Sequence, residues 1–282
     1  MFRLLWQEIL FRRNAIIGWG LGLCFFPIVY MSVYPSAAEE MRSLADLEIY
    51  QAMGVNLGTF EDFVGSTVIL FVPILASVYA LINGTGSLAG EEEDGRLEIL
   101  ITLPLKRWQV LTVKAIALSI ALFVILLIVS LVSALVFSAV ESQVETEMNA
   151  AGMITGLLST WPLTFAFAMI SMFLATFCSR RRVAALIATA ILILSYFGSN
   201  LAGMVSSLES LKPIFLHNYL DATGASLTEG QQVNDMLVLL AVGLVAYALA
   251  LFFFQRRDIT VGAWPWQRGK MPAGDVSSAS SA

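Results

Sequence analysis

The chain has 282 residues, of which 58% are hydrophobic and only 13% are charged, and its mean hydropathy is +0.79. A soluble domain is closer to half apolar and a quarter charged, so composition excludes a soluble enzyme, a nucleic-acid-binding protein and a disordered chain. The formal net charge is -5, and two cysteines and the single histidine, His217, are too few for a disulfide scaffold or a His-rich metal or haem site.

The first residues, 1–14, interleave apolar and basic side chains. Leu5, Trp6, Ile9 and Leu10 share one face at the helical spacing. A basic amphipathic segment with a tryptophan is typical of a helix that lies in the plane of the inner membrane surface, and we expect such a helix here. The alternative is that these residues simply begin a long first span.

Six stretches without Asp, Glu, Lys, Arg or His reach the roughly 20 residues that a membrane-spanning helix needs. They lie at about 15–34, 63–89, 115–140, 152–178, 183–207 and 236–254. The first ends without a small-residue cleavage site, which favours a retained span over a signal peptide. The predicted fold class is therefore an all-α integral membrane protein, with a single six-span domain over 1–260 and a largely disordered cytoplasmic tail over 261–282.

The positions of Lys and Arg predict the orientation. Of the 16 basic residues, all but Arg42 and Lys212 lie before the first span, between spans two and three, between spans four and five, or after span six. The positive-inside rule makes these segments cytoplasmic. We therefore expect a multi-pass protein of the cytoplasmic (plasma) membrane, in contact with its lipids and with both termini inside.

The expected spans lack the groups that would let this chain supply its own energy. Ion-coupled transporters need ionisable residues at membrane depth, and none lies in the six stretches. The chain also lacks the G-x-x-x-x-G-K-[ST] motif that cradles nucleotide phosphates. We therefore predict that the chain is not an enzyme and binds no cofactor itself, so that energy for uphill movement comes from a partner.

The connection between spans two and three is the most informative segment. Four consecutive acids, 91–94, precede Leu97, Leu100, Ile101 and Pro104, which have i, i+3, i+4, i+7 spacing. Pro104 ends the expected short helix because it has no N–H to donate. Such a helix on the cytoplasmic face is suited to docking another protein. The alternative is that the acids only cap a solvated helix, favoured there by the helix dipole.

This connection resembles that of permease subunits of ATP-binding-cassette (ABC) transporters of the ABC-2 type. Their connection typically has the pattern Ala-Gly-Glu-x-x-x-Gly-Thr-Leu-Glu-x-Leu-Leu-x-x-Pro-x-x-Arg, followed by a lysine. The matching residues here are Ala89, Gly90, Glu91, Gly95, Leu97, Glu98, Pro104, Arg107 and Lys114. The chain departs at Arg96, where the family usually has threonine, and conservatively at 99–101. The run 254–259 after the last span is also similar to that family's ending.

The resemblance implies a permease that dimerises, with a second copy or a paralogue, and rests on cytoplasmic ATPase subunits that bind ATP and magnesium. It implies that 95–103 is the coupling helix and that export is the direction of transport. The implied ATPase-docking residues are Glu91, Glu93, Gly95, Leu97, Glu98, Leu100, Ile101, Pro104 and Arg107. The alternative function is a membrane anchor, or an assembly or signalling component, without transport.

Two further features bear on the path of a substrate. The outer connection 208–235 is apolar yet too short to span, which favours short surface-lying or re-entrant helices; the resemblance implies that they form a lid. We expect His217 there to be a satisfied interfacial residue. Uncharged polar residues that are candidates for the path are Asn83, Thr85, Tyr196, Ser199 and Asn200. Such side chains also hydrogen-bond between helices, and the absence of charge favours a lipophilic or amphipathic substrate.

Overall fold

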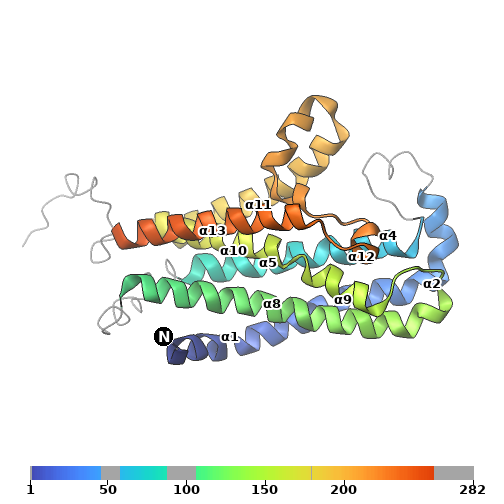
Figure 1. Cartoon of the computed structure of the whole chain (residues 1–282), viewed down its shortest axis with the longest axis horizontal. Helices are drawn as coiled ribbons and strands as arrows, with labels where there is room; N and C mark the ends of the chain where they lie inside the picture. The colour runs from blue at the N-terminus through green and yellow to red at the C-terminus, as the bar shows by residue number, and fades with distance from the viewer. Residues whose placement is uncertain (1, 46–57, 88–105, 179, 257–282) are drawn as a thin grey trace, which may run out of the picture.

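A computed structural model describes residues 2–45, 58–87, 106–178 and 180–256 (Figure 1). Within these residues, six helical stretches are long and apolar enough to cross a membrane: Phe2–Glu40, Phe60–Thr85, Arg107–Gln143, Ala150–Phe177, Arg181–Met204 and Val233–Arg256. Each overlaps one expected span, so the prediction of an all-α protein with six membrane-spanning helices is confirmed. The expected tail at 261–282 lies outside the described residues.

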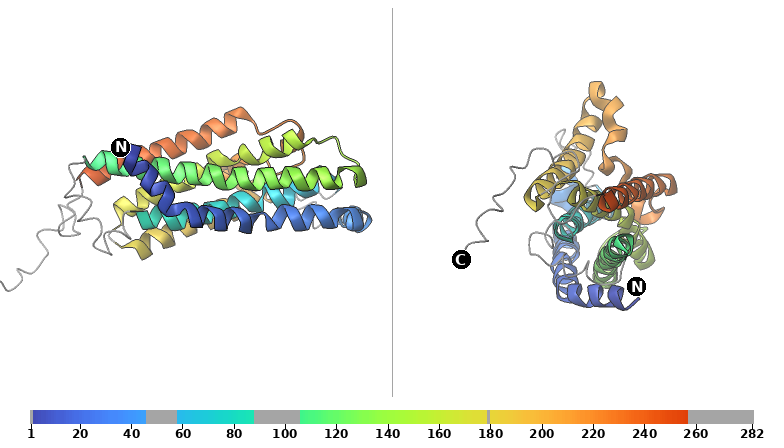
Figure 2. Two further views of the ribbon diagram at one scale, coloured as in Figure 1. Left: turned by 90° about the horizontal axis from the view of Figure 1, so that it is seen from below. Right: turned by 90° about the vertical axis from the view of Figure 1, so that its left-hand side faces the viewer.

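The first stretch consists of α1 (Phe2–Leu23) and α2 (Phe25–Ala45). The backbone hydrogen bonds from Cys24 to Gly20 and from Ile28 to Cys24 carry the helix across the junction. The amphipathic residues 2–14 therefore belong to the same continuous helix as the first span. Their turns run at an angle to the rest of α1 (Figure 2), and their position in the plane of a membrane stays a prediction.

The second stretch contains an irregular turn. It consists of α4 (Phe60–Val64), the π-helical turn η1 (Gly65–Ile69) and α5 (Phe71–Thr85). The Thr59 hydroxyl caps α4 by accepting a hydrogen bond from the N–H of Asp62 at 3.1 Å. The third stretch is α8 (Arg107–Val140) followed by η3 (Glu141–Gln143). Because α8 begins well before residue 115, Lys114 lies inside the helix and not in the connection.

The remaining stretches are α9 (Ala150–Leu158) with α10 (Trp161–Phe177), then α11 (Arg181–Met204), and finally α13 (Val233–Arg256). Asn149 caps α9 by accepting a hydrogen bond from the N–H of Gly152 at 2.7 Å. Between α11 and α13 lie the short helices η4 (Ser206–Ile214), η5 (Leu216–Tyr219) and α12 (Ala225–Thr228). The expectation of short helices in this connection is therefore confirmed.

The helices pack around α8 and α10. Helix α10 lies between α5 and α13, and α1 runs along α8 (Figure 2). Tyr79, Phe137 and Phe167 are among the largest buried side chains of the core. By contrast, α11 and α13 bury only 22% and 28% of their most apolar windows, as lipid-facing helices do. The carboxyl end of α11 and η4 stand away from the bundle (Figure 1).

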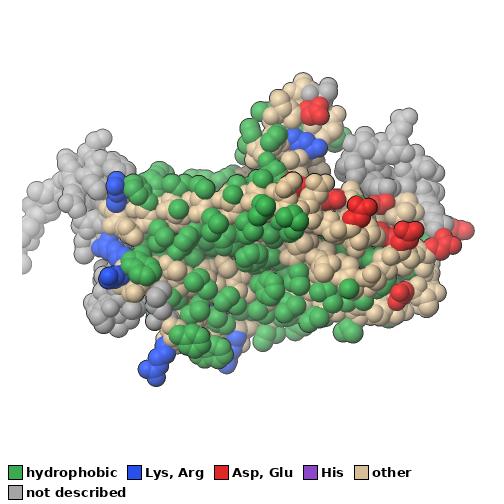
Figure 3. All heavy atoms as spheres, viewed as in Figure 1, with side chains coloured by type: hydrophobic (Ala, Val, Ile, Leu, Met, Phe, Trp, Pro, Cys, Tyr) green, Lys and Arg blue, Asp and Glu red, His purple; other side chains and the backbone are tan. Residues whose placement is uncertain are grey.

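Charged side chains separate along the bundle. Lys and Arg gather at the end where α1 begins and α13 ends, whereas Asp and Glu gather toward the opposite end (Figure 3). Apolar side chains cover much of the surface between them. The helix ends that flank residues 88–105, the carboxyl end of α5 and the amino end of α8, lie at the basic end (Figure 1).

Candidate functional site

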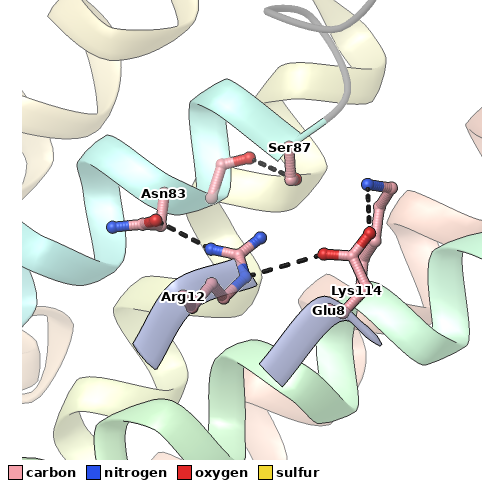
Figure 4. Close-up of polar contacts among 6 residues, drawn as sticks. Glu8, Arg12, Asn83, Ser87 and Lys114 are labelled. Atoms are coloured by element: carbon pink, nitrogen blue, oxygen red, sulfur yellow. Dashed lines mark hydrogen bonds and ion pairs between the residues drawn. The ribbon is translucent and has the colours of Figure 1, made fainter. Parts of the chain in front are cut away.

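A buried group of charged residues joins these two helix ends to α1 (Figure 4). The Nζ of Lys114 donates to Oε1 of Glu8 at 3.1 Å, and the Nη1 of Arg12 donates to Oδ1 of Asn83 at 2.7 Å. The Nε of Arg12 forms a longer ion pair, 3.7 Å, with Oε2 of Glu8. Lys114 is 1% exposed and Arg12 is 8% exposed. We call these four residues, Glu8, Arg12, Asn83 and Lys114, the charged cluster.

The spacing of the residues explains how the charged cluster forms. Glu8 and Arg12 are four residues apart on α1, so both project from the same face of the helix. Asn83 lies near the last turn of α5 and also donates to the carbonyl of Tyr79 at 3.0 Å. Lys114 lies about two turns into α8. The charged cluster thus ties one face of α1 to the helix before residue 88 and to the helix after residue 105.

Burial makes these contacts energetically important. Removing one partner of a buried ion pair costs several kcal/mol, because the other charge is left without compensation. Here a single carboxylate, that of Glu8, faces two cations, those of Arg12 and Lys114. The Nε of Arg12 has no hydrogen-bond partner among the described residues. The charged cluster is therefore held together by charge, and the Nε of the Arg12 guanidinium makes no hydrogen bond within the described residues.

The carboxyl end of α5 is bonded to α10 and lies close to the start of α11. The Ser171 hydroxyl of α10 donates to the carbonyl of Ala80 at 3.2 Å, and a Cβ on Gly84 would overlap that hydroxyl. A Cβ on Gly86 would lie 3.1 Å from the guanidinium of Arg181, at the start of α11. The helix that leads into residues 88–105 is thus fixed on three sides.

The amino end of α8 is fastened in a similar way. The hydroxyls of Thr112 on α8 and Tyr247 on α13 lie 2.7 Å apart and share a hydrogen bond. The first turn is closed by the Gln109 side chain, whose Oε1 accepts from the N–H of Lys106 at 3.0 Å. Any displacement of residues 88–105 therefore acts on helix ends that are bonded to α1, α10 and α13.

Of the expected ATPase-docking residues, only Arg107 is described. It is half-buried at the first position of α8. The others lie outside the described residues: Glu91, Glu93, Gly95, Leu97, Glu98, Leu100, Ile101 and Pro104. Their role stays a prediction.

The candidate path residues fall into two groups. Asn83 and Thr85 lie at the carboxyl end of α5, where Asn83 belongs to the charged cluster and the Thr85 hydroxyl donates to the carbonyl of Leu81 at 2.7 Å. Tyr196, Ser199 and Asn200 lie in the carboxyl-terminal part of α11. There the Asn200 side chain donates to the carbonyl of Tyr196 at 2.9 Å. Their contribution to a path stays a prediction.

A second polar assembly joins α4 to two connections at the acidic end. Oε1 of Glu61 accepts from the N–H of Glu147 at 2.8 Å and from the Thr146 hydroxyl at 2.5 Å. Oδ1 of Asp62 accepts from the N–H of Gly224 at 2.8 Å. We call these five residues the loop junction. They line an open cavity of about 470 Å³ together with Gly58, Thr59, Phe60, Glu145, Ala225 and Thr228.

His217 fixes the connection between α11 and α13. Its backbone N–H donates to the Ser195 hydroxyl at 3.0 Å, and its Nδ1 lies 3.0 Å from the same oxygen. The ring packs against Phe167 and Tyr196. Burial lowers the pKa of His217 from 6.5 to about 4. The side chain is thus a neutral anchor, although its Nε2 lacks a hydrogen-bond partner among the described residues, so it is only half satisfied.

The part of the chain that the structure describes holds no group of three His, Cys, Asp or Glu residues able to bind a metal. Sequence reasoning missed the charged cluster, because it placed Glu8 and Arg12 in a helix on the membrane surface and Lys114 in the connection between spans two and three. One sequence feature does indicate that Lys114 belongs to a helix. Arg107 and Lys114 are seven residues apart, which is two turns of a single helix.

Comparison with known proteins agrees with this architecture. The sequence model of a family described as ABC-2 family transporter protein matches residues 2–259. A search of curated proteins gives no match.

Proposed function

Since the chain belongs to the ABC-2 transporter family and is a permease subunit of an ABC transporter, we propose that it exports its substrate while docked on a separate cytoplasmic ATPase. The docking segment is 91–108. The ATPase binds ATP and magnesium and hydrolyses the nucleotide, and the permease performs no chemistry of its own.

The distribution of charge supports the proposed orientation. Basic side chains gather at the end of the bundle where α1 begins and α13 ends (Figure 3). This end faces the cytoplasm of the plasma membrane under the positive-inside rule. Both termini and the docking segment then lie on the side where ATP is available.

The observation that carries the proposal is the fastening of the two helix ends that flank the docking segment. Asn83 and Lys114 are both bonded to α1, through Arg12 and Glu8. When ATP closes the ATPase, a push on the docking segment reaches the ends of α5 and α8 together. Because these ends are bonded to other spanning helices, the push moves the bundle and not only a loop.

We further propose that two permease chains, this one with a second copy or a paralogue, form the substrate path. Asn83, Thr85, Tyr196, Ser199 and Asn200 are its candidate lining. The exposed position of Asn200 on α11 supports this role, because an amide that faces lipid is unfavourable and gains from a polar partner or substrate. A lipophilic or amphipathic substrate suits a path that lacks charge.

The first test is a pull-down of the tagged chain in mild detergent, with identification of partners and an ATP-hydrolysis assay. We expect a stoichiometric P-loop ATPase, lost when Leu97→Asp and Leu100→Asp are combined. The matched control combines Leu208→Asp and Leu211→Asp, which have the same spacing on exposed residues of η4. The control should retain the ATPase.

Two outcomes would contradict the proposal. One is a monodisperse chain that yields no ATPase even after cross-linking before extraction. The other is an ATPase that stays bound to the Leu97→Asp, Leu100→Asp variant as well as to the control, which would place docking elsewhere.

A further inference from the structure

We infer that the charged cluster is a two-position joint, in which the Glu8 carboxylate moves from Lys114 to Arg12 when the docking segment is pushed. This inference rests on the proposed function and adds the element that passes the push into α1. Glu8, Arg12 and Lys114 are then positioning residues for transport.

The first step of the argument is the place of the charged cluster in the chain. In the sequence, residues 88–105 connect α5 to α8. Asn83 precedes this segment by about one turn, and Lys114 follows the start of α8 by about two turns, or roughly 10 Å of helix. Both pieces are short, so a displacement at their outer ends reaches the charged cluster through only one or two helical turns.

The second step is the unequal geometry around Glu8. One carboxylate oxygen accepts from Lys114 at 3.1 Å, which is a formed hydrogen bond. The other oxygen lies 3.7 Å from the Nε of Arg12, which is too long for one. That Nε is buried and has no hydrogen-bond partner among the described residues. A shift of less than about 1 Å brings Nε and the carboxylate into hydrogen-bond distance.

The third step is that a purely structural role does not require these charges. Apolar residues of similar volume often replace a buried ion pair without loss of stability, and sometimes with a gain. A carboxylate between two cations offers something that apolar packing lacks, namely two alternative partners for one charge. Such a bistable contact converts a small shift into a discrete change.

The direction of the exchange follows from the helices involved. Lys114 belongs to α8, whereas Glu8 and Arg12 belong to the same helix, α1. While Glu8 is bonded to Lys114, α1 and α8 are locked together. When Glu8 turns to Arg12, the pair lies within α1, and the hydrogen bond between α1 and α8 is lost while Arg12 still holds Asn83 of α5. The exchange thus removes one polar link that opposes movement of α1 and α5 against α8.

The test measures movement at the far end of the bundle and needs no substrate. Cys24 and Cys178 are replaced by Ala, and spin labels are attached at Ser36→Cys on α2 and Gln143→Cys in η3, both exposed positions. The complex of full-length permease and ATPase in lipid nanodiscs is trapped with ATP and vanadate. Pulsed EPR then gives the distance between α2 and the end of α8, with and without nucleotide.

We expect the distance to change in the parent complex. Glu8→Gln and Lys114→Met should each reduce the shifted population at least about tenfold, because Glu8→Gln removes the carboxylate that both pairings share and Lys114→Met removes one of the two pairings. Arg13→Gln is the matched control, since Arg13 neighbours Arg12 in the sequence but is exposed. It should leave the distance change intact. If Glu8→Gln alone fails to assemble, combining it with Lys114→Met leaves one buried cation without a carboxylate instead of two, namely Arg12, which still donates to Asn83.

The combination of Glu8→Lys with Lys114→Glu separates a joint from a fixed ion pair. It keeps an attractive pair between α1 and α8 but moves the carboxylate to α8 and places a second cation beside Arg12. A joint predicts that the complex assembles and the movement is lost. Full movement in this combination would show that a fixed pair suffices and would overturn the inference.

Failure of the inference is distinguishable from failure of the proposed function. If the parent chain binds no ATPase, the proposed function is wrong. If the complex forms but the distance ignores ATP and vanadate, or if Glu8→Gln and Lys114→Met respond like the parent, the inference is wrong and the proposed function stands.

Discussion

Gly84 of α5 lies directly against Ser171 of α10, so closely that a Cβ on Gly84 would overlap the serine hydroxyl. That hydroxyl donates to the carbonyl of Ala80 on α5 at 3.2 Å. Small residues allow membrane helices to approach until such contacts form. This contact holds α5 in place one residue away from Asn83, and therefore sets the position of the charged cluster.

Replacing Gly84 should destabilise the protein. We expect Gly84→Ala to cost about 1–3 kcal/mol, because the added methyl group forces α5 and α10 apart. Gly18→Ala is the control, since a Cβ there meets nothing within 4 Å and a helical alanine is intrinsically favourable. Thermal unfolding in detergent measures both. Equal melting temperatures for the two variants would contradict the tight contact.

Breaking the loop junction should loosen the connections at the acidic end. Glu61→Ala leaves the N–H of Glu147 and the Thr146 hydroxyl without their acceptor, at a cost of about 1–3 kcal/mol. We expect faster cleavage within 144–148 by a protease added from outside. In Glu147→Ala the backbone N–H is unchanged, so cleavage should match that of the parent. Equal cleavage rates for the two variants would show that the hydrogen bonds to Glu61 do not hold residues 144–148 in place.

His217 should make stability fall in mild acid. Its pKa is about 4 in the folded chain and about 6.5 when unfolded, so the unfolded state binds more protons between these values. The contribution is complete above pH 6.5 and is lost as the pH falls toward 4, by up to about 3 kcal/mol. Melting temperatures from pH 8 to 4 for the parent and His217→Gln measure it. Parallel curves would show that burial does not shift the titration.

The proposed orientation predicts which cysteines an impermeant maleimide reaches in intact cells. With Cys24 and Cys178 replaced, Gln143→Cys should react from outside and Gln255→Cys, in the last turn of α13, should not. Replacing arginines 180–182 by glutamate should disturb this pattern, because it removes basic charge that holds the turn inside. Reaction of Gln255→Cys from outside in the parent would reverse the assignment.

The apolar runs located all six spanning stretches, because uncharged length alone is a strong signal for a helix in lipid. The same criterion excluded Lys114 from the spans, and so it did not reveal the charged cluster. Lys114 was assigned to a connection because a lysine normally interrupts a span, yet α8 includes it since Glu8, distant in sequence, neutralises it. Pairings over such separations leave no periodic pattern in one sequence. The close approach of Gly198 to the Phe215 ring is equally invisible, although the short helices there were expected.

The π-helical turn at Gly65–Ile69 has a consequence for how this region tolerates insertions and deletions. A π turn contains one residue more than an α turn, and each residue of a helix rotates the chain by roughly 100°. Deleting one residue from the turn would let the stretch run as a regular α-helix from Phe60 to Thr85. It would also rotate Glu61 and Asp62 away from Glu147 and Gly224. The surplus residue is thus a spacer that orients the two carboxylates, and the turn also requires glycine at position 65, where a Cβ would overlap the carbonyl oxygen of Ala222.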